Sequence, residues 1–209
     1  MTEIVRLSGS DEAIVEQAAQ LIHTQFDGPT GWRRLEDARD EVAEVVRHGL
    51  AFGAVEAAAL VGWVGGLIQY DGRVVELHPL VVHRDWRGRG IGRSLVRRLE
   101  NEASGRGAFT VVLGTDDDTG MTSLAGVDLY DDLPARLAGL RDLGRGHPSG
   151  FYRALGYTVV GVVPDANGPG KPDILMAKRL SERAAPASGA RRASSPSGGS
   201  SEREDGAAG

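Results

Sequence analysis

The sequence predicts an α/β domain built on a mixed β-sheet, and two observations lead to that prediction. Stretches rich in β-branched residues alternate with segments of helical apolar spacing, the pattern of strands joined by crossover helices. The apolar run Val74–Val82 leads into a glycine-rich turn over residues 87–92, and an amphipathic helix follows directly. A strand, a glycine turn and a helix in this order favour a sheet that holds an anion at the helix N-terminus.

The elements follow one another with short connections. Residues 3–7 are expected to form a strand, and residues 11–26 a helix, because Ile14, Ala18, Leu21 and Ile22 share one face. A short helix near residues 151–156 ends at Gly156, a residue type suited to the position after a helix. The remaining predicted elements are a helix over 35–47, strands over 51–57, 60–69, 74–82 and 109–113, a helix from the glycine turn to about residue 102, and strands over 159–163 and 171–178.

Length and composition limit the possible classes of protein. The 209 residues suit one domain, expected over 1–180, and the Ala/Ser/Gly-rich segment 181–209 is expected to be a disordered tail. A net charge of −5 argues against nucleic acid and suits a cationic partner. There is no cysteine, which excludes disulfides, a cysteine nucleophile and thiolate metal sites. Since no signal-like leader or apolar run of roughly 18 residues occurs, we expect a cytoplasmic protein without a membrane segment.

The glycine turn is the most informative segment. Gly88, Gly90 and Gly92 carry no Cβ, so consecutive backbone amides can approach phosphate oxygens at the positive end of the following helix. No Gly-Lys-Ser or Gly-Lys-Thr follows, and the glycine spacing is not that of the dinucleotide fingerprint. The pattern therefore indicates a pyrophosphate site of another type, and its alternative is an ordinary turn before a surface helix.

The pattern R-x-x-G-x-G at residues 87–92 resembles motif A of the GNAT superfamily of N-acetyltransferases, which holds the pyrophosphate and pantetheine of acetyl-CoA. The resemblance implies the GNAT fold, a mixed central β-sheet with splayed strands 4 and 5 flanked by helices. It also implies a set of residues that bind acetyl-CoA as co-substrate: Leu80, Val81, Val82, Arg87, Gly88, Arg89, Gly90, Ile91, Gly92 and Tyr152.

Acetyl transfer to an amine needs a neutral amine, a donor to the oxyanion and a proton for the leaving thiolate. In a regular strand Glu76, His78 and Leu80 would share one face. Pro79 cannot donate to a ladder, so it favours either a splay that frees the Leu80 N–H or an ordinary edge strand.

Each candidate catalytic side chain has a second interpretation. Glu76 is interpreted as the base or counter-charge, with a solvated surface glutamate as the alternative. His78 is a second base or a structural histidine. Tyr152 is the candidate acid, because a phenol matches a thiolate in basicity, and its alternative is a purely structural tyrosine.

A longer series of matches over about residues 60–180 resembles the aminoglycoside 6′-N-acetyltransferases of the enterococcal chromosomal type. It includes 76–82, 113–117, His147-Pro148, Phe151-Tyr152 and 171–174. In that group the residues matching Glu76, His78 and Leu80 are the proposed active-site set, and the one matching Tyr152 is the proposed acid. The resemblance implies substrate-binding residues at Phe26, Tyr70, Glu76, Asp116, Asp118 and Thr119. Two of these positions differ from the group: Phe26 replaces a pocket tryptophan, and Thr119 replaces an aspartate.

Three functions remain open on the sequence. The first is acetyl transfer to an aminoglycoside, and the second is the same reaction on a polyamine, a small metabolite or a protein amine. The third is a non-catalytic acyl-CoA-binding regulatory module, which would not need both Glu76 and Tyr152. The expected partner is a cationic small-molecule amine, a homodimer is left open, and no metal is expected because the Asp116–Asp118 acids form too loose a cluster.

Overall fold

The computed structural model describes residues 2–26 and 31–180, and the predicted tail over 181–209 lies outside this range. Seven strands form one sheet in the order β1-β2-β3-β4-β5-β7-β6. Neighbouring strands are antiparallel except β4 and β5, which are parallel. The strands are β1 Glu3–Arg6, β2 Leu50–Glu56, β3 Ala59–Gln69, β4 Val74–Val82, β5 Thr110–Asp116, β6 Thr158–Val163 and β7 Asp173–Arg179. The helices are α1 Glu12–Gln25, α2 Leu35–His48, α3 Ile91–Gly105, α4 Leu133–Ala138 and α5 Ser149–Arg153, with 3-10 turns η1 Tyr70–Gly72 and η2 Arg84–Trp86.

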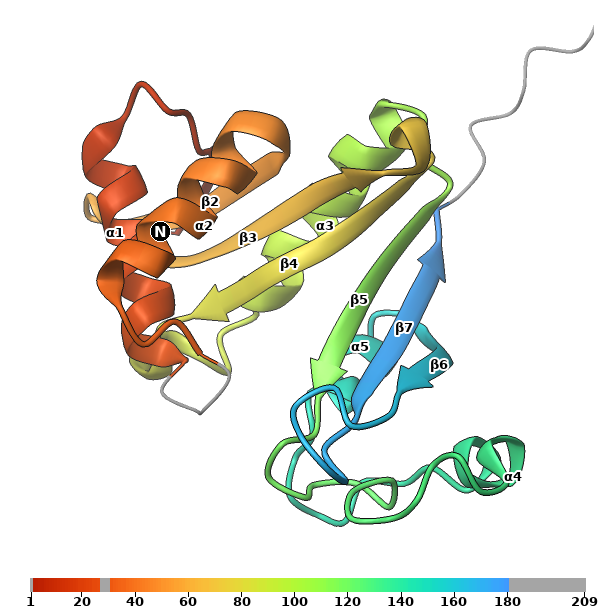
Figure 1. The fold of residues 1–209 in the computed structure, drawn as a ribbon. Coiled ribbons are helices and arrows are strands. Elements are labelled where there is room, and N and C mark those ends of the chain that lie inside the picture. Colours follow the sequence, from red (N-terminus) through yellow and green to blue (C-terminus); the bar gives the residue numbers. More distant parts are fainter. Residues whose placement is uncertain (1, 27–30, 181–209) are drawn as a thin grey trace, which may run out of the picture.

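Different helices cover the two faces of the sheet. α1 and α2 pack together on one face of the N-terminal half, around the fully buried Trp63, whose Nε1 donates to Ala18 O at 3.1 Å. α3 and α5 contribute to the core on the opposite face, which includes Leu95 and Tyr152. Figure 1 shows α1 and α2 beside the N-terminal strands, and the C-terminal strands β5, β7 and β6 diverging from them.

The order and type of the predicted elements are confirmed, with differences at their ends. Asp11 accepts the Ile14 N–H at 3.1 Å and so starts α1 one residue later than expected. β5 does not stop at Leu113 but continues to Asp116 because it pairs with β7 over its whole length. The short helix α4 was not predicted. In the described ranges, no helix is both long and apolar enough to cross a membrane.

β4 and β5 separate partway along their length. They pair only from Val74 to Glu76 on β4 and from Thr110 to Val112 on β5, although both strands continue beyond these residues. The predicted splay is therefore confirmed. It opens the sheet beside the second half of β4, where the functional candidates lie.

A bulge in β4 reverses the faces of its second half. Gly66 lies opposite Leu77 and Val64 opposite Leu80, so Gly65 alone faces both His78 and Pro79. A Cβ on Gly65 would lie 3.0 Å from the His78 carbonyl carbon and closer still to its oxygen, so the bulge requires glycine there.

The expectation that Leu80 shares a face with Glu76 and His78 is therefore wrong. Leu77 and Leu80 both pack into the core on the α3 face, whereas Val81 joins the core on the α1–α2 face. The extra residue at the bulge shifts the side-chain alternation by one, so Leu80 moves to the face opposite His78.

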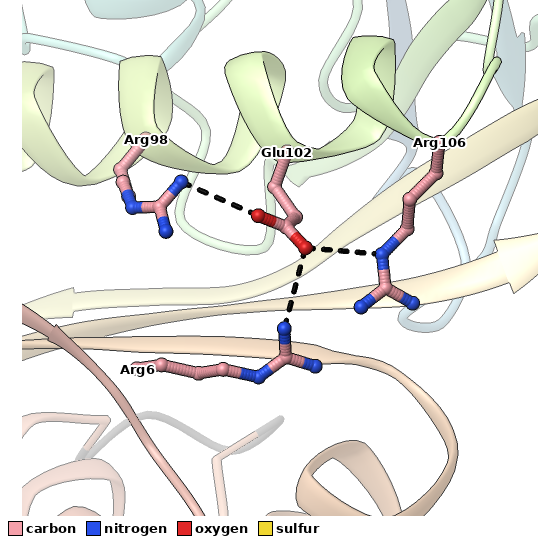
Figure 2. A network of polar contacts seen from close by, with 4 residues as sticks. All are labelled: Arg6, Arg98, Glu102 and Arg106. Atoms are coloured by element: carbon pink, nitrogen blue, oxygen red, sulfur yellow. Dashed lines mark hydrogen bonds and ion pairs between the residues drawn. The ribbon is translucent and has the colours of Figure 1, made fainter.

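A cluster of charges attaches α3 to the edge of the sheet (Figure 2). Glu102 accepts from Arg6 of β1 at 3.2 Å, from Arg98 at 3.4 Å and from Arg106 at 3.1 Å. The hydrogen bond from Arg106 is the main cause that holds the pKa of the Glu102 carboxyl below its ordinary value. These contacts fix the helix whose N-terminus lines the larger cavity described next.

Candidate active site

The glycine turn and the start of α3 line a cavity of about 610 Å³, called here the turn cavity. Gly88 and Gly90 adopt positive φ angles of 76° and 83°, which bring the chain sharply from η2 into α3. The residues that line the turn cavity are Leu80, Val81, Val82, Trp86, Arg87, Gly88, Gly90, Ile91, Gly92, Arg93, Pro148, Phe151 and Tyr152.

The N-terminus of α3 presents free amides to the turn cavity. The first bond of the helix runs from Ser94 N–H to Gly90 O, and no side chain caps the helix in the described structure. The amides of Ile91, Gly92 and Arg93 therefore have no carbonyl within the helix, and all three residues line the cavity. Together with the helix dipole, this is an arrangement suited to phosphate oxygens.

A second cavity of about 340 Å³, called here the acidic cavity, shares Leu80 with the turn cavity. Asp116, the last residue of β5, and Asp118, two residues later, both line the acidic cavity. Its lining residues are Gln25, Phe26, Gly31, Leu77, His78, Pro79, Leu80, Gly114, Thr115, Asp116, Asp118, Pro148 and Tyr152. Leu80, Pro148 and Tyr152 line both cavities, so the two spaces meet where β4 and β5 separate.

The backbone of β4 directs the Leu80 amide to this meeting point. His83 N–H donates to Val61 O at 2.9 Å, which makes His83 a hydrogen-bonded position of the β3–β4 ladder. Positions alternate along an antiparallel ladder, so Val82 and Leu80 turn their N–H and C=O groups away from β3. Past Glu76 no β5 residue pairs with β4 on that side in the described structure, so the Leu80 N–H has no partner in the sheet.

Tyr152 reaches the meeting point from α5. Its side chain is 7% exposed and packs edge-on against Phe151 and Tyr157, with ring centroids 5.0 and 5.5 Å apart. Burial raises the pKa of the Tyr152 phenol, which therefore keeps its proton throughout the neutral range.

The buried His147 fixes α5 relative to the end of β5. Its Nδ1 accepts the Ser149 N–H at 3.2 Å, so the proton lies on Nε2, which is 3.2 Å from the Asp116 carbonyl oxygen and donates to it. This side chain thus ties together the two segments that carry Asp116 and Tyr152. The sequence motif His147-Pro148 marked the segment but did not indicate either contact.

The structure places some of the predicted residues outside both cavities. Glu76 lines neither within the described ranges, and it accepts from Gln69 Nε2 at 3.2 Å. Arg89 stacks its guanidinium 4.6 Å above Trp86 and donates to Asp85 O. Tyr70 is 76% exposed in η1, at the other end of the β3–β4 hairpin. Thr119 is also outside the cavities, whereas its neighbour Asp118 lines the acidic one.

His78 has partners on the α1–α2 face. Its Nε2 lies 3.6 Å from Glu41 Oε1 of α2, and its ring centroid lies 5.7 Å from that of Trp32. Trp86, Arg93 and Pro148 line the cavities and were not among the predicted site residues. They come from η2, α3 and the start of α5, which only the fold brings together. Across residues 2–26 and 31–180, no three His, Asp or Glu side chains converge as a metal site.

Residues 15–130 of the chain match the acetyltransferase (GNAT) family. The structure is similar to that of an aminoglycoside 6′-N-acetyltransferase in complex with coenzyme A, with 38% identity, a TM-score of 0.80, and coverage of 87% of this chain and 98% of that one. The enzyme of the same name from Enterococcus faecium gives 38% identity, a TM-score of 0.79 and the same coverage.

A shorter match links the chain to an acetyltransferase of Photorhabdus laumondii, 40% identical over 67 residues, which are 31% of this chain and 47% of that protein. The chain spans about half the length of the curated relatives that it matches. The family match covers more than half of the chain and includes β4, the glycine turn and α3. The chain therefore belongs to the acetyltransferase (GNAT) family.

Proposed function

We propose that this protein is an acetyl-CoA-dependent N-acetyltransferase that acetylates the 6′-amine of an aminoglycoside. The observation that carries this proposal is the meeting of the two cavities at Leu80 and Tyr152. One cavity offers free helix amides for a pyrophosphate, and the other offers carboxylates for a cationic amine. Similarity to two aminoglycoside 6′-N-acetyltransferases at 38% identity over nearly their full length supports the choice of acceptor.

The residues at the meeting point divide the reaction between them. The Leu80 N–H donates to the carbonyl oxygen of the thioester and stabilises the oxyanion as it forms. Tyr152 gives its phenolic proton to the departing thiolate. Asp116 and Asp118 attract the acceptor ammonium groups. Glu76 acts as a counter-charge and does not contact the acceptor directly, which agrees with the hydrogen bond that its carboxylate accepts from Gln69.

A panel of amines tests the proposed acceptor. The purified protein is mixed with acetyl-CoA and with kanamycin, spermidine, glucosamine 6-phosphate or a peptide amine, and free thiol is measured. We expect kanamycin to give the highest kcat/KM, because its several ammonium groups match the acidic cavity. A higher kcat/KM for spermidine or the peptide would show that the acceptor is an amine other than an aminoglycoside. Binding of acetyl-CoA without turnover on any amine would indicate a regulatory module.

A substitution in the glycine turn tests the coenzyme side. Gly90→Val adds a branched side chain at φ 83°, beside the amides that face the turn cavity, so acetyl-CoA should bind at least 10-fold more weakly, about 1.4 kcal/mol. Isothermal calorimetry measures this Kd. Gly107→Val is the matched control, since Gly107 has φ 93° with open space around it but does not line either cavity. Equal affinities in the two variants would contradict the assignment.

A further inference from the structure

Asp173 lies next to Gly114 of the acidic cavity, although it lines neither cavity itself in the described structure. It begins β7 directly opposite Asp116 in the β5–β7 ladder. A Cβ built on Gly114 would lie 2.7 Å from Asp173 Oδ1 and closer still to Oδ2. The carboxylate therefore occupies the space above Gly114, and Gly114 lines the acidic cavity together with Leu80 and Tyr152.

The hydrogen bonding of Asp173 differs from that of the neighbouring carboxylates. Its Oδ1 is enclosed and has no hydrogen-bond partner among the described residues. Asp116, by contrast, accepts from Asn167 Nδ2 at 2.6 Å, and Glu76 accepts from Gln69. An enclosed carboxylate oxygen without a donor costs stability, so its presence beside a cavity points to a function.

The surroundings of Asp173 favour the protonated form of its carboxyl. Burial is the main cause that raises its pKa, to about 6, and the charge of Asp116 raises it further. From β4, Glu76 raises the pKa and His78 lowers it, and the backbone N–H of Thr115 also lowers it. On the other side, the β6 residue paired with Asp173 is the uncharged Val163. A carboxylate of this basicity is suited to accept a proton near neutral pH.

We infer that Asp173 is the general base of the acidic cavity, the group that removes a proton from the acceptor ammonium before its nitrogen attacks the thioester. The inference rests on the proposed acetyl transfer and adds a residue to it. Two observations carry it: the carboxylate lies above a cavity-lining glycine, and one of its oxygens is enclosed without a partner among the described residues.

The protons and electron pairs of the reaction then balance. Asp173 takes one proton from R–NH3+, and the nitrogen lone pair forms the C–N bond while the carbonyl pair moves to the oxygen. The oxyanion re-forms its C=O bond, the C–S bond breaks, and its electron pair leaves with sulfur. Tyr152 protonates the thiolate and is restored by the second proton of the nitrogen. Asp173 later releases its proton to water, so ammonium and thioester give amide, thiol and one H+.

The pH dependence of kcat/KM for kanamycin with acetyl-CoA, followed by thiol release, tests the inference. The wild-type profile should show an acidic limb with an apparent pKa of about 6, since Asp173 must be ionised to act. In Asp173→Asn this limb should disappear, and kcat should fall by a factor of about 10²–10⁴, the usual contribution of a general base. An unchanged limb and kcat in this variant would overturn the inference.

Two further variants separate Asp173 from its neighbours. Asp116→Asn removes the like charge opposite Asp173, so the acidic limb should move to lower pH. Asp118→Asn removes a carboxylate that lines the cavity but is not among the charges acting on Asp173, so it should raise KM for kanamycin without moving the limb. If Asp173→Asn does not fold, an unmoved limb in Asp116→Asn overturns the inference.

Thermal unfolding gives a readout that does not depend on activity. The folded-state pKa of Asp173 lies above its ordinary value, so its contribution to stability is present at low pH and is lost as the pH rises through about 6. Asp173→Asn should therefore raise Tm at pH 8 and change it less at pH 4. A lower Tm of this variant at pH 8 would show a structural role instead.

Wild-type inactivity on every amine would overturn the proposed function itself, whereas an active wild type with an unaltered Asp173→Asn profile overturns only this inference.

Discussion

Tyr152→Phe is expected to lower kcat by a factor of about 10²–10⁴ while the Kd of acetyl-CoA stays nearly unchanged. The substitution removes the hydroxyl of a residue that lines both cavities, but it keeps the ring that packs against Phe151 and Tyr157. Because the proton is needed only when the thiolate leaves, the loss should appear in kcat rather than in binding. Steady-state kinetics with kanamycin and calorimetry with acetyl-CoA measure the two quantities.

Tyr157→Phe is the matched control for this prediction. Tyr157 is 4% exposed and is in ring contact with Tyr152, but it lines neither cavity in the described structure. Its substitution also removes a phenolic hydroxyl, but from the neighbouring ring and not from the one assigned to the reaction. The value of kcat should therefore stay near that of the wild type. Full activity of Tyr152→Phe, or equal losses in the two variants, would remove Tyr152 from the role of acid.

Gly65→Ala is expected to destabilise the fold by about 1–3 kcal/mol and to lower kcat/KM by a factor of about 10–10². The added Cβ would press on the backbone carbonyl of His78 and lie 2.8 Å from Val45 Cγ1, and neither is the free end of a flexible side chain. To relieve this contact the bulge must shift, which changes the direction of the Leu80 amide. Denaturant unfolding and steady-state kinetics on the same preparation measure both losses.

Gly105→Ala is the control for the steric argument. Gly105 is the last residue of α3, and a Cβ there would meet nothing within 4 Å among the described atoms. Alanine favours helix over glycine by up to about 1 kcal/mol, so this variant should be as stable as the wild type or more so. If Gly65→Ala unfolded at the same denaturant concentration as Gly105→Ala, the bulge would not require glycine.

Local sequence signals were sufficient for most of the fold. The spacing of apolar residues predicted the helices and strands in their order, and Val74–Val82 is a strand with the predicted bounds. Residues 87–92 predicted the turn and the helix start, because a positive φ at Gly88 and Gly90 is a local property of the chain. Pro79 indicated either a splay or an edge strand, because a residue without an N–H cannot continue a ladder, and the structure shows the splay.

The side-chain directions in β4 could not be predicted in the same way. The alternation of a strand assigns Leu80 to the face of His78, and this holds only if the strand is regular. The bulge arises because Gly65, thirteen positions earlier in the chain, faces two residues of β4. Pairing across strands determines this register, and no local pattern within residues 74–82 reports it.

The sequence by itself determined the family, the glycine turn that leads into α3 and the position of the tyrosine on α5, since each depends on residues that are neighbours in the chain. Only the tertiary structure decided which side chains share a cavity. Asp116 and Asp173 are 57 positions apart in the sequence, but they are directly paired in the sheet. Glu76 and His78 are only two positions apart, but only His78 lines the acidic cavity. The physical reason is that the basicity of a carboxyl and its access to a ligand depend on burial, nearby charge and strand register. These come from contacts between strands that the order of residues does not specify.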